Sequence, residues 1–327
     1  MAVTNIGFFL LIALVVVLLA GLAYLALRPA GIARLASRAR PAAGYDEALQ
    51  RVAALKAQEA DVCNPDCETQ LLVHGQRTPR AIVFLHGYTS CPKQFVPLGR
   101  QFYDRGYNVL IARLPRHGLA DRLTADHGRL SAVELAAFAD EVVDIGVGLG
   151  EHLTLAGLSG GGVTTAWAAQ NRAELDLAVI IAPAFGFKLL PAAATVPMAN
   201  VVPLLPDVFV WWEPELQEKS GPPHAYPRYS RHALAQILRL GFATRAHAGR
   251  RPAAARSILV VTNANDATVD NAAAASMAAA WRASGAAGLR AYEFPAELGL
   301  PHDLIDPEST GARVELVYPK LLELIDG

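Results

Sequence analysis

Residues 153–170 read LTLAGLSGGGVTTAWAAQ, and this stretch decides the fold. A run of β-formers ends at Ser159, glycines stand close on both sides of it, and an alanine-rich segment typical of a helix begins at once. A G-x-S-x-G turn between a strand and a helix strains the serine backbone and lifts its hydroxyl clear of the sheet. The helix N-terminus directs partial positive charge at the same place. We therefore expect Ser159 to be a nucleophile.

A glycine-rich phosphate cradle is the alternative for this stretch. The residues do not fit G-x-G-x-x-G, and the lysine of a P-loop is absent. The stretch also follows several predicted strands instead of opening the sheet. These differences favour the nucleophile.

Outward from this turn, apolar runs that predict strands alternate with segments that predict helices. The strands are expected at 70–75, 81–87, 107–114, 152–157, 175–183, 257–263 and 289–295, and the helices at 45–59, 91–106, 131–148, 160–172, 270–284 and 311–325. Such alternation predicts an α/β fold with a mostly parallel sheet covered by helices on both faces. The proline-rich segment 184–250 interrupts it, and we expect a cap over the carboxyl edge.

Residues 6–27 carry no charge, and this length of apolar chain predicts an N-terminal transmembrane helix and an anchor over residues 1–27 that contacts the lipid bilayer. A cleaved signal peptide is less expected, because no Lys or Arg precedes the run and the run is long for one. Residues 28–67 are expected to form a linker and a juxtamembrane helix. Residues 68–327 are expected to form the main domain.

The arginines that follow the apolar run, at 28, 34, 38 and 40, predict a single-pass protein with its main domain in the cytoplasm. The cysteines favour the other side of the membrane, because Cys63 or Cys67 has Cys91 as a possible disulfide partner. A net charge of −1 gives no field that would attract nucleic acid.

A serine nucleophile needs a general base and an acid that orients the base. In a fold of this kind the chain order is Ser159, acid, base. Asp266 lies just after one predicted strand, in NANDATVD, and His302 lies after the last, in LPHD. Asp270 is a rival acid, but its position at the start of a helix is typical of an N-cap. We predict the triad Ser159, Asp266 and His302.

The tetrahedral intermediate needs donors for its oxyanion. The loop HGYTS follows a buried strand, and the backbone N–H groups of Tyr88 and Gly160 are the expected donors. His86 and His117 precede glycines at strand ends and are expected to support those turns. This chemistry needs no metal and no cofactor.

With these motifs in order, the chain resembles the α/β-hydrolase superfamily over about residues 68–325. The motifs are HGYTS, LPRHG, GLSGG, NANDATVD and LPHD. It is most similar to the carboxylesterase, monoacylglycerol lipase and lysophospholipase branch. This resemblance implies hydrolysis of medium or long acyl monoesters or lysolipids through an acyl-serine intermediate. Arg116 stands where that branch commonly has glycine, which puts the shape of its loop in doubt.

The substrate is open to several interpretations. Trp211 and Trp212 are candidate walls of an acyl pocket, although packing of the cap explains them as well. Glu213, Glu215 and Glu218 would suit the ammonium group of a proline-iminopeptidase substrate, or form a solvated helix end. Acyl transfer to an alcohol other than water and a non-catalytic binding protein are the remaining alternatives.

Overall fold

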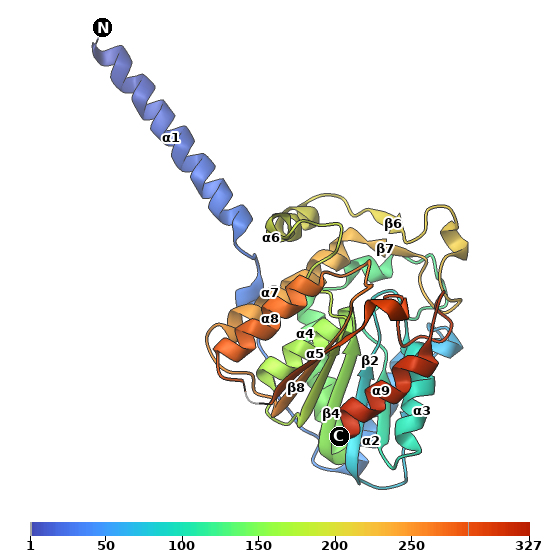
Figure 1. Cartoon of the computed structure of the whole chain (residues 1–327). Coiled ribbons are helices and arrows are strands. Elements are labelled where there is room, and N and C mark those ends of the chain that lie inside the picture. The colour runs from blue at the N-terminus through green and yellow to red at the C-terminus, as the bar shows by residue number, and fades with distance from the viewer. Residues whose placement is uncertain (1, 287) are drawn as a thin grey trace.

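A seven-stranded sheet forms the centre of the main domain in this computed structural model (Figure 1). The structure describes residues 2–286 and 288–327, with the backbone alone for residues 2–7 and 25. The strand order is β1-β3-β2-β4-β5-β8-β9. β1 pairs antiparallel with β3, and every other pair is parallel. The strands are β1 (Gln70–Leu72), β2 (Thr78–Leu85), β3 (Asn108–Ala112), β4 (Gly150–Leu158), β5 (Leu177–Ile181), β8 (Ser257–Asn263) and β9 (Leu289–Phe294).

The apolar runs become the buried strands of this sheet. Every residue of β3 and β5 is buried, as are the last five residues of β2. In register across the sheet, Val83 pairs with Leu110 on one side and Leu155 on the other. Strands covered on both faces read as continuous apolar runs. The predicted α/β fold with a mostly parallel sheet is confirmed.

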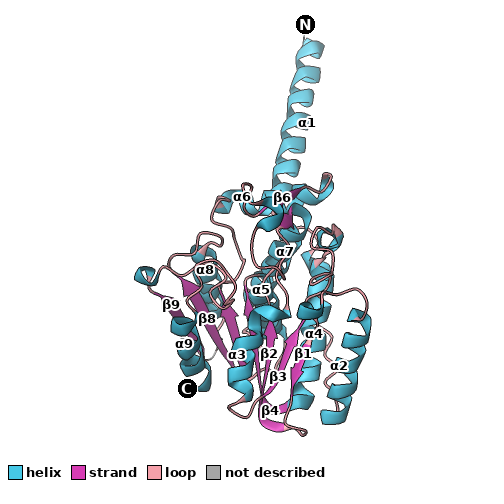
Figure 2. Ribbon diagram, turned by 90° about the vertical axis from the view of Figure 1, so that its right-hand side faces the viewer, coloured by secondary structure: helices cyan, strands magenta, loops and turns pink. Residues whose placement is uncertain are grey.

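Helices cover both faces of the sheet (Figure 2). They are α2 (Tyr45–Glu59), α3 (Val96–Tyr103), α4 (Ala132–Leu149), α5 (Gly160–Asn171), α7 (Arg231–Ala248), α8 (Asn271–Ala283) and α9 (Val314–Asp326). α4 begins at a capping box, in which Ser131 Oγ accepts from the Glu134 N–H at 3.1 Å and Glu134 Oε2 accepts from the Ser131 N–H at 2.9 Å.

The segment between β5 and β8 contains α6 (Ala192–Val201), a short hairpin and α7. The hairpin pairs β6 (Phe209–Trp211) with β7 (Arg228–Ser230). α6 and the hairpin lie over the carboxyl edge of the sheet (Figure 2). α7 instead packs against α5, with Leu240 fully buried, so this helix belongs to the body of the domain.

Helix α1 (Ala2–Leu27) extends away from the domain (Figure 1). The described apolar side chains along it are exposed, as at Phe9 and Leu22. Among the residues whose side chains are described, no helix is long and apolar enough to cross a bilayer. The prediction of a transmembrane helix over 6–27 is therefore not supported, and part of that range falls on side chains outside the described residues.

The base of α1 is attached to helix α6. Asn200 of α6 donates through Nδ2 to the carbonyl oxygens of Ala26 and Arg28, at 3.1 and 2.7 Å. Its Oδ1 accepts from the Ala30 N–H at 2.9 Å. A polar side chain that binds both donors and acceptors of one segment fixes that segment in place. The chain therefore leaves α1 at a defined point beside α6.

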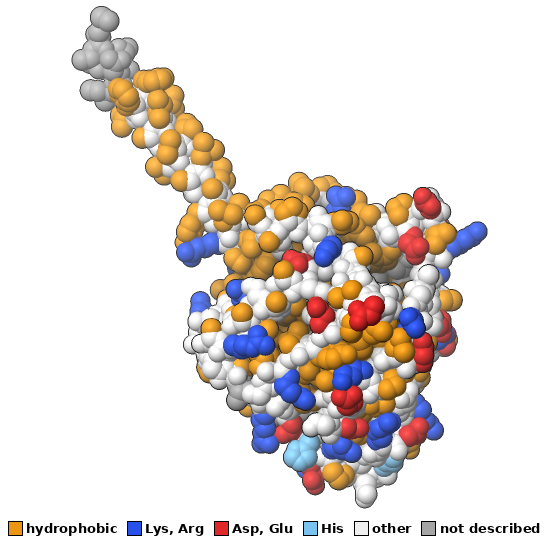
Figure 3. All heavy atoms as spheres, viewed as in Figure 1, with side chains coloured by type: hydrophobic (Ala, Val, Ile, Leu, Met, Phe, Trp, Pro, Cys, Tyr) orange, Lys and Arg blue, Asp and Glu red, His pale blue; other side chains and the backbone are white. Residues whose placement is uncertain are grey.

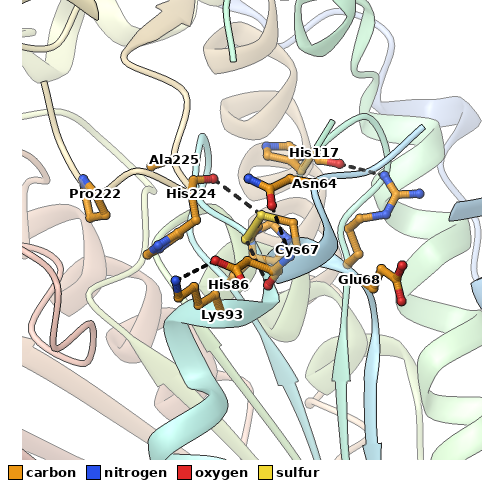
Figure 4. Close-up of a disulfide and its surroundings, with 12 residues drawn as sticks. Asn64, Cys67, Glu68, His86, Lys93, His117, Pro222, His224 and Ala225 are labelled. Atoms are coloured by element: carbon orange, nitrogen blue, oxygen red, sulfur yellow. Dashed lines mark hydrogen bonds and ion pairs between the residues drawn. A yellow bond between two sulfur atoms is a disulfide. The ribbon is translucent and has the colours of Figure 1, made fainter. Parts of the chain in front are cut away.

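A disulfide joins Cys67 to Cys91, with a Cα–Cα distance of 5.2 Å (Figure 4). Both cysteines are fully buried, whereas Cys63 is free. Of the two pairings that the sequence leaves open, the structure therefore has the one with Cys67. The bond ties the segment before β1 to the loop that follows β2.

Candidate active site

The turn at Ser159 has the geometry expected of a nucleophile. Its φ of 55° and ψ of −111° place the residue in a strained conformation between β4 and α5. A β-carbon added at Gly157 would lie 2.3 Å from the Gly161 carbonyl oxygen, and one at Gly161 would lie 2.3 Å from the Leu85 carbonyl oxygen. Only glycine fits at these two positions, and their close packing forces the turn.

His302 and Asp266 form a short hydrogen bond at the carboxyl edge. His302 Nδ1 lies 2.7 Å from Asp266 Oδ2. The other carboxylate oxygen accepts from the N–H groups of Thr268 and Val269, each at 2.9 Å. These bonds fix the carboxylate, which in turn fixes the ring.

The rival acid Asp270 has a structural role. It is the N-cap of α8, and its side chain accepts from the Ala272 N–H at 2.9 Å. Capping satisfies a helix donor that would otherwise have no partner. The structure therefore places Asp266, and not Asp270, beside His302.

The electrostatics of the pair suit a base that becomes charged. Burial works against charge on His302, but the hydrogen bond and negative charge of Asp266 outweigh it and raise the pKa of the ring. Burial likewise opposes charge on Asp266, yet His302 and two backbone donors lower the pKa of the carboxyl. A neutral ring that donates Nδ1–H to Asp266 keeps its lone pair on Nε2.

Ser159 and His302 line the same cavity, which has a volume of about 190 Å³. A second, more apolar cavity of about 540 Å³ adjoins it. The two share four lining residues, Phe187, Trp212, Leu234 and Thr268. A hydrogen bond from Ser159 to His302 stays a prediction.

The backbones of the two expected oxyanion donors meet beside the serine. A β-carbon added at Gly160 would lie 3.4 Å from the Tyr88 amide nitrogen. One added at Gly87 would lie 3.7 Å from the Ser159 β-carbon. His86 accepts from the Leu114 N–H at 3.0 Å, so it connects the turns after β2 and β3.

The two tryptophans take different places. Trp212 lines both cavities, and Trp211 lines the second. The Trp212 indole N–H donates to Thr89 Oγ1 at 2.9 Å. Sequence reasoning missed Thr89, because a threonine in a turn carries no signal of a contact more than a hundred residues away.

The cavity also has an acidic side. Asp303 lies in its wall next to His302, and Gln94 Nε2 donates to its Oδ1 at 3.2 Å. Burial raises the pKa of Asp303. All three glutamates, Glu213, Glu215 and Glu218, are exposed, but only Glu213 lines the cavity, where it accepts from Ser220 Oγ at 2.9 Å. In the sequence, the position of Asp303 directly after the predicted base His302 was the available signal that it lies in the cavity wall.

The loop whose shape the sequence left in doubt is held by ion pairs. Arg116 has a φ of 66°, in the region that glycine prefers. Its guanidinium lies 3.1 Å from Asp126 and 2.8 Å from Glu134. These contacts hold the non-glycine residue in the conformation of the turn.

Several solved structures share this architecture. The structure of a metagenome-derived lipolytic enzyme, from work on LipS and LipT, is 18% identical with a TM-score of 0.59, covering 81% of this chain and 99% of the other. The monoacylglycerol lipase of Paleococcus ferrophilus is 18% identical with a TM-score of 0.59, covering 78% and 96%. A soluble variant of monoglyceride lipase from Saccharomyces cerevisiae, bound to a substrate analogue, is 14% identical with a TM-score of 0.57, covering 79% and 91%.

At these identities the likeness shows a shared fold. No curated protein matches the sequence of the chain. The family model described as "Serine aminopeptidase, S33" matches residues 76–287, which include Ser159 and Asp266. Because this match spans more than half of the residues, the chain belongs to that family of α/β-hydrolases.

Proposed function

We propose that the protein is a serine hydrolase that cleaves the carboxylic ester of a lipid-like molecule with one acyl chain. The observation that carries the proposal is the shared cavity. Ser159 stands in a strained turn, and His302, oriented by Asp266, lines the same space. The shared fold with monoacylglycerol lipases supports the choice of an ester.

In the proposed reaction, Ser159 Oγ attacks the acyl carbon and its proton passes to His302 Nε2. The N–H groups of Tyr88 and Gly160 stabilise the oxyanion that forms. The alcohol leaves with the proton from His302, and an acyl-serine remains. Water, deprotonated by the same ring, then releases the fatty acid and restores the serine.

The second cavity supports a medium or long acyl chain. Its volume of about 540 Å³ lies in the range of small-molecule pockets. Its walls are mostly apolar, with Leu190, Met198, Val202 and Trp211 from the cap and Leu238 from α7 among them. An acyl chain bound there would pass Phe187 and Trp212 to reach the serine.

Labelling with a fluorophosphonate probe tests the nucleophile. Wild type is expected to be labelled and Ser159→Ala is not, while both unfold at similar temperatures.

A panel of p-nitrophenyl esters from acetyl to palmitoyl, run beside proline anilides, tests the substrate. Turnover of anilides alone would replace the esterase by an aminopeptidase, and transfer of the acyl group to added glycerol in preference to water would make it an acyltransferase. Absence of labelling in wild type would favour a non-catalytic binding protein.

We also propose that α1 holds the domain at a lipid surface. The support is the exposed apolar surface of α1 and of the adjoining cap, at Leu189, Leu204 and Leu205 (Figure 3). The full chain should sediment with phosphatidylcholine vesicles, and a variant without residues 2–27 should stay in the supernatant while it still hydrolyses p-nitrophenyl acetate. Sedimentation of both forms would contradict the proposal, as would self-association of the full chain without binding to vesicles.

We propose that the domain works in an oxidising compartment, against the cytoplasmic side predicted from the arginines. The buried Cys67–Cys91 disulfide supports this, since such bonds are rare in reducing compartments. When the protein isolated from cells is unfolded without reductant, alkylation should modify Cys63 alone. Modification of all three cysteines would restore the original prediction.

A further inference from the structure

The loop between β2 and α3 holds an expected oxyanion donor in a conformation that needs external support. Thr89, directly after Tyr88, has a φ of 69°. Left-handed backbone is unfavourable for a β-branched residue and persists where surrounding contacts impose it. The contacts made by Thr89 therefore decide the position of the Tyr88 backbone.

Two of these contacts come from the cap. The Tyr226 N–H donates to the Thr89 carbonyl oxygen at 2.7 Å. The Trp212 indole N–H donates to Thr89 Oγ1, and the same hydroxyl donates to the Tyr88 carbonyl oxygen at 2.6 Å. This chain of hydrogen bonds runs from the cap, through one hydroxyl, to the carbonyl oxygen of Tyr88, whose N–H is the expected oxyanion donor. Bonds in such a chain polarise and strengthen one another.

The Tyr88 side chain is held by the same part of the cap. Its hydroxyl accepts from the Ser230 N–H at 3.0 Å, where β7 meets α7. Burial lowers the pKa of His127 to about 4, and Nδ1 of the neutral ring lies 2.9 Å from the Tyr88 hydroxyl oxygen, within hydrogen-bond distance. The ring of Tyr88 is therefore fixed at its far end as well.

The other end of the loop is fixed covalently. Cys91, two residues beyond Thr89, is bonded to Cys67 (Figure 4). The disulfide holds the loop to the body of the domain, while the bonds to Thr89 hold it to the cap. A movement of the cap would therefore act on the segment from Tyr88 to Thr89.

We propose that the cap positions the oxyanion hole through Thr89, with Trp212 as a positioning residue. When the cap sits as in this structure, the Trp212–Thr89 bond holds the Tyr88 N–H toward the oxyanion. When the cap lifts, the Trp212–Thr89 bond breaks and the Tyr88 N–H no longer points toward the oxyanion. The proposal rests on the proposed ester hydrolysis, and it gives Trp212 a role other than that of an acyl-pocket wall.

The test compares matched variants on a short and a long ester. Thr89→Val removes the hydroxyl at constant shape, Thr89→Ser keeps it, and Trp212→Phe removes the indole N–H. For p-nitrophenyl acetate, whose acyl group is too short to need the apolar cavity, Thr89→Val and Trp212→Phe should each lower kcat by about 3- to 10-fold with little change in KM. Thr89→Ser should recover most of the rate. The double variant should be no slower than either single one, since both remove the same bond.

The possible outcomes distinguish a positioning role of Trp212 from a role as an acyl-pocket wall. If Trp212→Phe slows hydrolysis of the palmitoyl ester alone, Trp212 is an acyl-pocket wall and the proposal is wrong. The proposal is also wrong if Thr89→Ser is as slow as Thr89→Val. If Thr89→Val does not fold, Trp212→Phe carries the test alone. A wild type that is not labelled by fluorophosphonate refutes the proposed function itself. A labelled wild type whose variants keep full kcat refutes only the link to the cap.

Discussion

Replacement of Asp266 by asparagine should change the rate and its pH dependence in a linked way. Catalysis needs neutral His302, so activity falls as pH drops through the pKa of the ring. Despite the burial of the ring, Asp266 raises that pKa above the usual 6.5, and the acid limb of wild type should lie above this value. In Asp266→Asn the negative charge beside His302 is gone while the ring stays buried, so the acid limb of the pH profile should move to a lower pH.

The maximal rate of Asp266→Asn in its pH–rate profile should fall at the same time. The bond lost is 2.7 Å long and strengthens when His302 becomes positive in the transition state. A hydrogen bond to a charged group contributes about 1.5–3 kcal/mol, which corresponds to a loss of about 10- to 150-fold in kcat. An asparagine that donates to Nδ1 would also impose the wrong tautomer, which in a comparable triad brings the loss to about 10⁴-fold.

The assay is kcat/KM for p-nitrophenyl butyrate measured from acidic to alkaline pH. Asp270→Asn is the matched control, because asparagine also caps helices and this side chain lies at the start of α8. It should reproduce the wild-type profile. The reasoning is refuted if Asp266→Asn keeps the wild-type rate, or if its acid limb stays in place while the rate falls.

Two further predictions concern the disulfide and the alcohol part of the substrate. Cys67→Ala with Cys91→Ala should cost about 3.5 kcal/mol, from the chain entropy of a loop that spans 24 residues. A melting temperature lower by about 7–14 °C should follow, with Cys63→Ala as the unaffected control, and an unchanged value would contradict it. Glu213 lines the cavity, and its described lining has no lysine or arginine, so lysophosphatidic acid should be hydrolysed more slowly than the monoacylglycerol with the same acyl chain. Glu213→Gln should narrow that difference in rate, and equal rates in wild type would contradict the role of this carboxylate.

Much of the sheet and the placement of the site residues follow from local sequence signals. The strands are apolar runs long enough to be buried on both faces, and the turn at Ser159 needs glycines at defined positions. Ser131 and Glu134 mark the start of α4 because a capping box involves only neighbouring residues. Asp266 and His302 follow strands whose carboxyl ends must share one edge. These features depend on short segments, which a single sequence contains in full.

The cap could not be predicted in the same way. β6 and β7 have three residues each and are separated by a proline-containing segment, so their pairing of Val210 with Tyr229 depends on tertiary contacts. The bond from Trp212 to Thr89 joins two residues with no common local pattern. The choice of Cys67 over Cys63 depends on where the segment before β1 passes the loop after β2. In each case the deciding contact lies between distant parts of the chain.

The distribution of backbone strain supports the placement of the site. In the described chain, four of the six non-glycine residues with positive φ lie in the loops at the carboxyl ends of β2, β3, β4 and β5. Ser159 and Ala182 come directly after their strands, and Thr89 and Arg116 lie in the turns that follow β2 and β3. Each such residue costs about 1–3 kcal/mol and persists only where the surrounding structure imposes it. The buried parallel strands supply that constraint, because their ends cannot move without disrupting the core. Strain at the ends of four neighbouring strands therefore identifies the carboxyl edge as the part of the domain arranged for chemistry, independently of the residues chosen for the triad.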